Sequence, residues 1–418
     1  MAAVSNILFL VHRLPYPPNK GDKVRSYHLL RHLQKNHRVF LGTFIDDPDD
    51  VQHLPVLQAM CKDLHVEHIE PRSAKIKSLS GLLTGEPLTL TYYRNAGMQR
   101  WVQQTVAEHK LQACVVFSSA MAQYAQPLLP DLPMLVDFVD VDSAKWTQYA
   151  PAHRWPLSMV YRREGRRLLA YERAVAAQAH CSYFVTPNET ALFVSQAPEA
   201  KGRVQSMGNG VDCDFFKPDA RFATPFEQGE EALVFTGAMD YWPNIDGVSW
   251  FVADMLPHLL ASHPSLRFYI VGRSPSPQVK ALAGPHVVVT GTVPDVRPYL
   301  QHASAVVAPL RVARGIQNKI LEAMAMQQPV VTVNSCADAI GASAGQGLLR
   351  ADKPEEFVTA LLGLLESPAD RAALGERARH YVEHECSWQA HLKKIDHDLA
   401  STFAPSDASA NPIATATA

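Results

Sequence analysis

The segment 309–325 holds the residues whose chemistry is easiest to interpret. It contains Gly315 and then a helix-forming run that begins near Ile316. The first turn of a helix leaves backbone N–H groups unpaired and carries a partial positive charge, so it suits a diphosphate. Glu322 follows about two turns into the helix, where a carboxylate could accept hydrogen bonds from the neighbouring hydroxyls of a ribose. This spacing predicts a binding site for a nucleotide sugar.

Basic residues accompany the same helix start. Arg311, Arg314 and Lys319 would bring cationic donors to a phosphate there, and Gln317 lies among them. The alternative is an ordinary helix, because residues 321–325, Leu-Glu-Ala-Met-Ala, are also good helix formers.

Two further segments with suitable chemistry lie in the first half of the chain. Gly21 follows the first predicted strand and begins a helix, so the backbone there could closely approach a phosphate or an acceptor; a plain helix-entry turn is the alternative. Asp140 follows another predicted strand and could orient an acceptor or donor-sugar hydroxyl. Its neighbours Asp142 and Ser143 have the residue types that cap a following helix.

The elements that must position these residues follow a repeated pattern. Short apolar runs alternate with longer amphipathic stretches, which is typical of parallel strands covered by helices. The predicted strands of a first series are 6–11, 39–44, 113–117, 134–138 and 182–186, with helices at 22–35 and 158–179. Those of a second series are 232–236, 266–271, 287–290, 305–309 and 329–333, followed by helices at 354–365, 368–383 and 387–401.

The repeated series predicts an α/β protein with two Rossmann-like, doubly wound domains. We assign residues 1–205 to the first and 206–383 to the second, with a polar connector at 219–230. Residues 384–403 are expected to fold back onto the first domain, and the Ala/Ser/Thr/Pro-rich tail 404–418 is expected to be disordered. Ligands bind at the carboxyl ends of parallel strands, so we expect the active site between the domains.

The composition indicates an ordinary globular protein. Of its 418 residues, 47% are hydrophobic and 19% charged, with a formal net charge of −2, which excludes a strong overall attraction to nucleic acid. No apolar run approaches the roughly 18–20 residues that cross a bilayer, and the chain's start lacks the pattern of a signal peptide. The expected location is the cytoplasm.

The sequence predicts no required metal. The six cysteines include no Cys-x-x-Cys pair. His28 and His32 are four residues apart in a predicted helix, but no third ligand is evident near them.

A cluster of arginines marks the long helix 158–179. Its five arginines are Arg162, Arg163, Arg166, Arg167 and Arg173. This basic face could rest peripherally on the anionic inner face of a membrane, where a lipid acceptor would be found, or it could simply be solvated or ion-paired.

Four segments carry a resemblance to a known family. The run 315–331, ending Gln-Pro-Val-Val, resembles the donor-site signature of the retaining GT-B glycosyltransferases of family 4. In the same order as in that family, residues 206–212 with Phe216 and Pro218 resemble its interdomain segment, 235–239 the strand and glycine that open its second domain, and 291–296 the loop beside the nucleotide base. The sequence looks most like the sugar transferases associated with bacterial exosortase (PEP-CTERM) and exopolysaccharide systems.

The resemblance implies both a function and a set of donor contacts. It implies a hexosyltransferase-type enzyme that moves a sugar, with retention, from a nucleotide-diphosphate sugar to a lipid-linked or polysaccharide acceptor, without a cofactor or an obligatory metal. It places Gly237 and Val293 at the donor, in the second domain.

The sequence departs from the family at three places. Position 314, eight residues before Glu322, is Arg314 where the family often has glutamate. No arginine and lysine follow Gly237, so Arg273 is expected to join Arg311, Arg314 and Lys319 in neutralising the diphosphate. Val139 stands where many members have histidine.

Alternatives to a glycosyl transfer remain. A sugar-nucleotide epimerase has the same fold, and a non-catalytic nucleotide-sugar-binding relative would tolerate these departures. The pattern Asp140-Val141-Asp142 also occurs in a metal-dependent glycosyltransferase fold with one nucleotide-binding domain, which the two-domain pattern contradicts. A nicotinamide dehydrogenase is disfavoured because no Gly-x-Gly-x-x-Gly follows the first strand of either domain.

Overall fold

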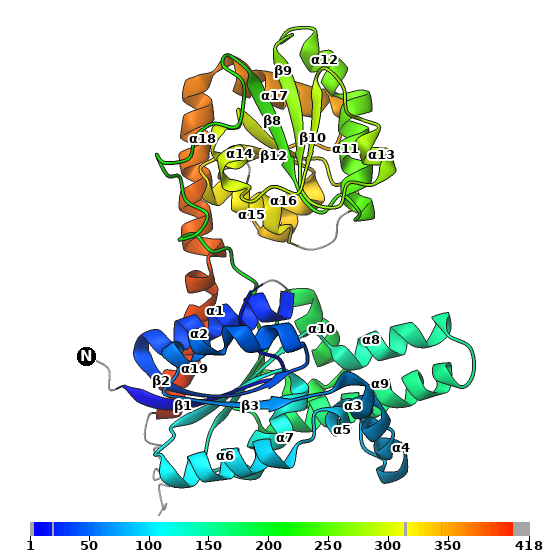
Figure 1. The fold of residues 1–418 in the computed structure, drawn as a ribbon, viewed down its shortest axis with the longest axis vertical. Coiled ribbons are helices and arrows are strands. Elements are labelled where there is room, and N and C mark those ends of the chain that lie inside the picture. The colour runs from blue at the N-terminus through cyan, green and yellow to red at the C-terminus, as the bar shows by residue number, and fades with distance from the viewer. Residues whose placement is uncertain (1–3, 19–20, 313–315, 344, 404–418) are drawn as a thin grey trace, which may run out of the picture. The chain divides into compact units, whose positions relative to one another are not determined.

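The computed structural model describes residues 4–18, 21–312, 316–343 and 345–403, apart from the side chain of residue 152. Internal contacts divide the chain into two compact units (Figure 1). Unit 1 comprises the chain up to Gly208 together with the part from Leu392 onward, and unit 2 comprises Asn209–His391. The predicted disordered tail 404–418 lies outside the described residues. No helix in the described part of the chain is long and apolar enough to cross a membrane.

Unit 1 is built on a parallel sheet of seven strands in the order β3-β2-β1-β4-β5-β6-β7. The strands are β1 (Ser5–Val11), β2 (His37–Ile45), β3 (Asp63–His68), β4 (Ala113–Phe117), β5 (Met134–Val139), β6 (Cys181–Phe184) and β7 (Val204–Ser206). Every residue of β4 is buried and β1 is nearly so, because helices cover both faces of the sheet. The winding direction reverses between β1 and β4, and this switch point is where ligands bind in such sheets.

Helices lie on both faces of the unit 1 sheet. In Figure 1, α1 and α2 lie on one face and α6 and α7 on the other. The helices of unit 1 are α1 (Gly21–Asn36), α2 (Leu54–Met60), α3 (Pro71–Ser78), α4 (Ser80–Thr84), α5 (Leu88–Tyr92), α6 (Ala96–Glu108), α7 (Ala122–Ala125), α8 (Asp142–Tyr149), α9 (Leu157–Gln178), α10 (Pro187–Gln196) and most of α19 (Trp388–Phe403).

Unit 2 has a parallel sheet of six strands in the order β10-β9-β8-β11-β12-β13. The strands are β8 (Glu231–Thr236), β9 (Leu266–Val271), β10 (Val287–Gly291), β11 (Ala305–Ala308), β12 (Val330–Thr332) and β13 (Leu348–Arg350). Its winding reverses between β8 and β11. The two doubly wound parallel sheets confirm the predicted fold class.

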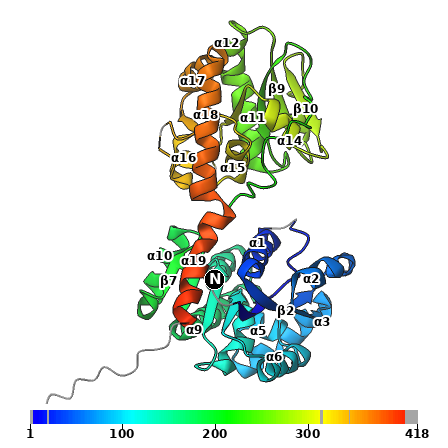
Figure 2. The ribbon, with the colours of Figure 1, turned by 90° about the vertical axis from the view of Figure 1, so that its left-hand side faces the viewer.

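The helices of unit 2 surround this sheet, and Figure 2 shows α17 and α18 beside one another. They are α11 (Trp242–Asp254), α12 (Leu256–Leu260), α13 (Pro277–Lys280), α14 (Arg297–His302), α15 (Asn318–Ala325), α16 (Asn334–Ile340), α17 (Pro354–Glu366) and α18 (Pro368–Tyr381). The helix predicted to reach residue 383 ends at Tyr381, because a π-helical turn, Val382–Cys386, follows.

The predicted connector 219–230 is part of unit 2. Phe226 is buried in the core of that unit, and its ring lies 4.6 Å from the ring of Tyr269 on β9. One apolar side chain therefore anchors a segment whose composition resembles a linker.

Candidate functional site

The first candidate site lies at the switch point of unit 2, at the carboxyl ends of β8 and β11. Gly237 follows β8, and its N–H donates to the carbonyl of Val271 over 3.0 Å. A Cβ atom at position 272 would lie 1.7 Å from the Gly237 oxygen, so glycine is required there for the loops after β8 and β9 to meet. This close approach shapes the floor of the site.

Lys319, in the first turn of α15, reaches the end of β8. Its ammonium donates to the side-chain oxygen of Asn244 over 2.5 Å and lies 4.2 Å from the centre of the Phe235 ring. A Cβ at position 237 would come within 2.8 Å of both Lys319 Nζ and Asn244 Nδ2. Gly237 therefore makes room for the lysine and its partner.

Asn244 was not singled out from the sequence. It is buried in α11, and its amide also donates to the carbonyl of Ala238 over 2.8 Å. Because it holds both the β8 loop and Lys319, Asn244 positions the lysine. Its place in a helix 75 residues from Lys319 gave no sequence signal.

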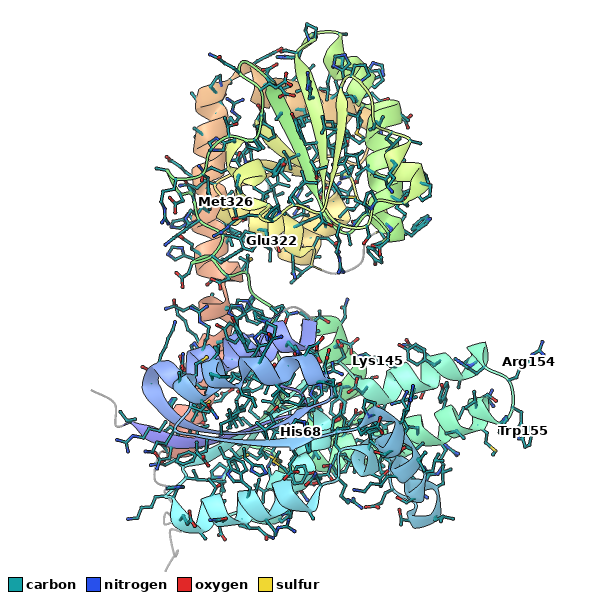
Figure 3. The ribbon with its side chains drawn as sticks, in the orientation of Figure 1. His68, Lys145, Arg154, Trp155, Glu322 and Met326 are labelled. Carbon is teal, nitrogen blue, oxygen red and sulfur yellow. The ribbon has the colours of Figure 1, made fainter. Side chains whose placement is uncertain are left out.

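Glu322 lies one turn after Lys319 on α15 and is half-buried (Figure 3). Burial raises the pKa of its carboxyl group to about 7, although the charge of Lys319 acts in the opposite direction. Burial likewise lowers the pKa of Lys319 to about 7, against the charges of Glu322 and Cys336. Within the described residues the Glu322 carboxylate has no hydrogen-bond or ion-pair partner.

The other predicted donor residues of unit 2 have different environments. Arg311 forms an ion pair with Asp246 on α11 at 2.7 Å, and its guanidinium lies 4.6 Å from the ring centre of Trp250. Arg273 is exposed after β9, and no hydrogen bond or ion pair of its side chain is found in the part of the chain that is described. Val293, after β10, packs against the core of the unit.

The predicted helix start is displaced. The helix begins at Asn318 rather than near Ile316, with Gln317 as the residue before it, and Ile316 packs against the core. Arg314 and Gly315 lie outside the described residues.

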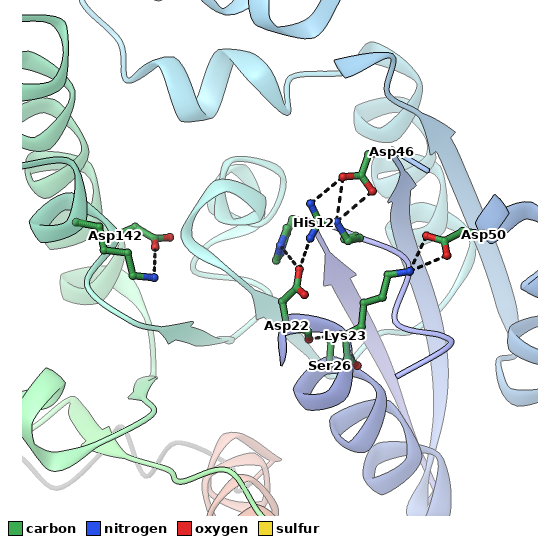
Figure 4. Close-up of polar contacts among 9 residues, drawn as sticks. His12, Asp22, Lys23, Ser26, Asp46, Asp50 and Asp142 are labelled. Atoms are coloured by element: carbon green, nitrogen blue, oxygen red, sulfur yellow. Dashed lines mark hydrogen bonds and ion pairs between the residues drawn. The ribbon is translucent and has the colours of Figure 1, made fainter. Parts of the chain in front are cut away.

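A second cluster lies at the switch point of unit 1, after β1. His12 stacks on Phe117, the last residue of β4, with ring centres 5.7 Å apart, and its Nε2 is 3.5 Å from the carboxylate of Asp22. Arg13 bridges Asp22 at 2.6 Å and Asp46 at 2.7 Å (Figure 4). His12 Nδ1 is buried without a partner among the described residues.

Electrostatics keep the Asp22 carboxylate of this cluster charged. Burial alone would raise the pKa of Asp22, but the hydrogen bond from His12 and the charge of Arg13 together hold that pKa well below its usual range. Lys23 and Asp50 form a buried ion pair at 2.6 Å beside it. His12 was not predicted from the sequence; its position directly after the first strand, ten residues before Asp22, was the available signal.

Gly21 begins α1 next to this cluster. A Cβ atom at position 21 would have no neighbour within 4 Å, so packing within the described chain does not require glycine there.

The three aspartates within and directly after β5 have separate roles. Asp137 is buried and ion-paired with Arg25 at 2.7 Å, a structural contact. Asp140 and Asp142 share Lys145, at 2.8 and 3.1 Å. The expectation that Asp142 and Ser143 cap the next helix was wrong.

The structure shows what replaces that cap. Helix α8 starts at Asp142 without a side-chain cap, and Ser143 instead donates to the buried Glu172 over 2.6 Å. Val139 has a φ of 69°, unusual for a β-branched residue, and this bends the chain just before Asp140.

No group of three histidine, cysteine or acidic residues placed to hold a metal occurs in the ranges described above.

Comparison with known proteins agrees with this architecture. Residues 230–367, which run from just before β8 to just after α17, match the family model described as "Glycosyl transferases group 1". No curated protein matches the chain by sequence.

Several solved structures resemble nearly the whole chain. Anabaena HepE in complex with UDP has a TM-score of 0.62 at 14% identity, covering 95% of this chain and 100% of its own. Sucrose-phosphate synthase from Thermosynechococcus elongatus has a TM-score of 0.59 at 18% identity, covering 96% and 99%. WaaG, a glycosyltransferase involved in lipopolysaccharide biosynthesis, has a TM-score of 0.55 at 18% identity, covering 94% and 99%. The fold they share with this chain is GT-B.

Proposed function

We propose that this chain, which has the GT-B fold, is a group 1 glycosyltransferase that takes a sugar from a nucleotide-diphosphate donor held at α15. The observation that carries this proposal is the pair Lys319 and Glu322. Two half-buried ionisable groups stand at a switch point, and the carboxylate has no partner in the described chain. Such groups are costly unless a ligand completes their hydrogen bonds.

A bound nucleotide-sugar donor would supply hydrogen-bond partners for both Lys319 and Glu322. The diphosphate accepts hydrogen bonds from Lys319, and the ribose hydroxyls donate to Glu322. HepE has been solved with UDP and with UDP-glucose, which makes a UDP-sugar the first donor to test.

The remaining donor residues are assigned by their positions, which are in unit 2 except for Gly21 at the start of α1 in unit 1. Arg273 is exposed and available for a phosphate, whereas Arg311 would first have to leave Asp246. The other proposed donor contacts are Gly21, Gly237, Val293, Gly315, Ile316 and Gln317.

Catalysis is proposed to depend on neutralising the departing diphosphate, with Lys319 and Arg314 as the cations. The donor's own phosphate takes the acceptor's proton, and the configuration at the sugar is retained. Asp140 orients a hydroxyl, for which it would exchange its contact with Lys145. No obligatory metal is proposed.

The proposed acceptor is lipid-linked or a polysaccharide, in exopolysaccharide biosynthesis of the exosortase-associated type. The proposed location is the cytoplasm, with peripheral contact to the anionic inner face of the membrane. The arginines of α9 and a relative that acts in lipopolysaccharide biosynthesis support this.

The test is metal-free calorimetric binding of UDP, GDP and ADP to the wild type, to Glu322→Gln and to a control, Glu355→Gln. Glu355 is exposed on α17. We expect one nucleotide to bind, Glu322→Gln to weaken it by about 1–3 kcal/mol through lost charge-assisted hydrogen bonds, and the control to bind normally. Absence of binding by all three nucleotides, or equal binding by Glu322→Gln, would overturn the donor site.

A further inference from the structure

A projecting part of unit 1 concentrates exposed apolar side chains. Eight of the fifteen large apolar side chains that are exposed among the described residues belong to it. Four come from α3, α4 and the residue between them, namely Ile76, Leu79, Leu82 and Leu83. The other four come from the end of α8, the connection to α9 and the start of α9, namely Tyr149, Trp155, Leu157 and Met159. We call these two groups together the tip surface.

The most exposed members stand clear of the protein. Leu83 is 92% exposed and Trp155 78% exposed. Figure 3 shows Arg154 and Trp155 at the far end of the α8–α9 hairpin, away from the unit 1 sheet. Patches of exposed apolar side chains commonly mark sites of protein or membrane contact.

Specific contacts hold α4 beside α9. The guanidinium of Arg163 donates to the carbonyls of Gly81, at 2.6 Å, and Glu86, at 3.2 Å. Its neighbour Glu164 is fully buried and accepts from the N–H of Leu88 at 2.7 Å, at the start of α5. The two groups of apolar side chains therefore belong to one packed assembly.

The charge around the tip surface is predominantly positive. Segments 71–85 and 143–171 contain nine lysines and arginines and one acidic residue, Glu164, which is buried. The whole chain has a net charge of −2, so this excess of positive charge is local. Seven of the nine cations are exposed, namely Arg72, Lys75, Lys77, Arg154, Arg162, Arg166 and Arg167.

We propose that the tip surface docks on an anionic lipid bilayer, with Trp155, Leu157 and Leu83 in the interfacial layer and the surrounding cations on lipid phosphates. Tryptophan and leucine favour that layer, and basic residues strengthen binding to anionic lipid. A second copy of this chain is a poor occupant, since it would bring like charges together. The inference gives the membrane contact of the proposed function a defined surface.

This surface differs from the arginine face predicted from the sequence. Arg163 is used within unit 1, and Arg173 pairs with Glu199 at 2.6 Å. The arginines of α9 that remain for a membrane are Arg162, Arg166 and Arg167, and the apolar insertion comes from segments that were not singled out.

The test is sedimentation of the full chain with phosphatidylcholine vesicles that contain or lack phosphatidylglycerol. We expect binding to the anionic vesicles, weakened by salt, with a blue shift of tryptophan emission that Trp155→Phe removes. The double variant Leu83→Ser/Trp155→Ser should reduce partitioning about tenfold or more. Arg162→Gln/Arg166→Gln/Arg167→Gln should do the same on anionic vesicles only.

Matched controls come from exposed residues elsewhere in unit 1. Val56→Ser on α2 and Arg100→Gln on α6 should bind vesicles as the wild type does. All variants should keep the wild-type calorimetric titration with UDP. Absence of UDP binding by the wild type would contradict the proposed donor site but would not affect the proposal for the tip surface.

Three outcomes would overturn the docking surface. They are no binding to anionic vesicles at low salt, equal binding by the tip variants and the controls, or a dimer in solution that the tip variants dissociate. Capture of an acidic protein by the tip without any binding to vesicles would also reject the lipid assignment.

Discussion

Lys319 and Glu322 lie one turn apart on α15, and burial shifts the pKa values of both side chains. Burial moves the pKa of the lysine down and that of the glutamate up, so both approach about 7. Near pH 7 neither group is fixed in its charged state, and a ligand that pairs with either will change the number of bound protons.

Nucleotide binding should therefore be accompanied by proton uptake above pH 7 and by proton release below pH 7. Above pH 7 the free lysine is partly neutral, and a diphosphate restores its higher pKa, so binding takes up a proton. Below pH 7 the free glutamate is partly protonated, and ribose hydroxyls that donate to its carboxylate lower its pKa, so binding releases one. Affinity should peak near neutrality.

Titrations in two buffers of different ionisation enthalpy, about one pH unit either side of 7, measure this linkage. Lys319→Met should lose proton uptake on the alkaline side and weaken binding by about 1.5–3 kcal/mol. Glu322→Gln should lose only the proton release below pH 7. Proton release that persists in this variant would come from the nucleotide's own phosphate. If both variants take up and release the same number of protons on binding as the wild type, the phosphate and the ribose do not contact Lys319 and Glu322.

Among the elements, α5 shows how a buried carboxylate can hold a short helix. Its five residues, Leu88–Tyr92, are too few to be stable alone. Glu164 from α9 accepts from Leu88 N at 2.7 Å, Thr89 N at 2.9 Å and the Thr89 hydroxyl at 2.8 Å. This cap also fixes the neighbouring α4 and hence the tip surface.

Glu164→Gln should destabilise unit 1 by about 1–3 kcal/mol, because the side-chain NH2 group of glutamine would face a backbone N–H of Leu88 or Thr89 in place of an accepting oxygen. Urea unfolding followed by circular dichroism measures the change. Glu199→Gln, which breaks only the exposed pair with Arg173, is the matched control and should be nearly neutral. Equal stability of the Glu164→Gln variant and the wild type would mean that α5 is held by packing alone.

The sequence predicted the buried strands well and missed three of the four edge strands, for a physical reason. Strands β4 and β9 were predicted to the residue because helices bury both of their faces, which demands a continuous apolar run. Strands β3, β7 and β13 were missed. They are short or partly exposed edge strands, and a segment such as Asp63–His68 has only two apolar residues among its six.

The site was predictable only where local sequence determines it. Lys319 and Glu322 are neighbours on one helix, so their spacing alone predicts a shared site. The pairings of Lys319 with Asn244 and of Arg311 with Asp246 join residues 75 and 65 positions apart, and local patterns do not encode them. Val139 adopts its positive φ because of the fold around it.

At the scale of the whole molecule, the two units differ in how the chain closes them. Unit 2 is one continuous segment with its own core, whereas unit 1 is completed by residues from the far end of the chain. In α19, Leu392, Ile395 and Leu399 are buried, and Asp398 accepts a hydrogen bond from Tyr183 at 2.6 Å.

Truncation after residue 391 should therefore unfold unit 1 and spare unit 2. Losing each buried aliphatic side chain costs about 2–5 kcal/mol, and three of them approach the roughly 5–15 kcal/mol that stabilises a domain. Calorimetry should show one thermal transition lost, while the remaining one still shifts upward with UDP through binding linkage. Deletion of 404–418, which leaves α19 whole, is the control and should retain both. A truncated chain whose remaining transition ignores UDP would mean that unit 2 does not bind the nucleotide by itself, and the donor site would then need residues from unit 1.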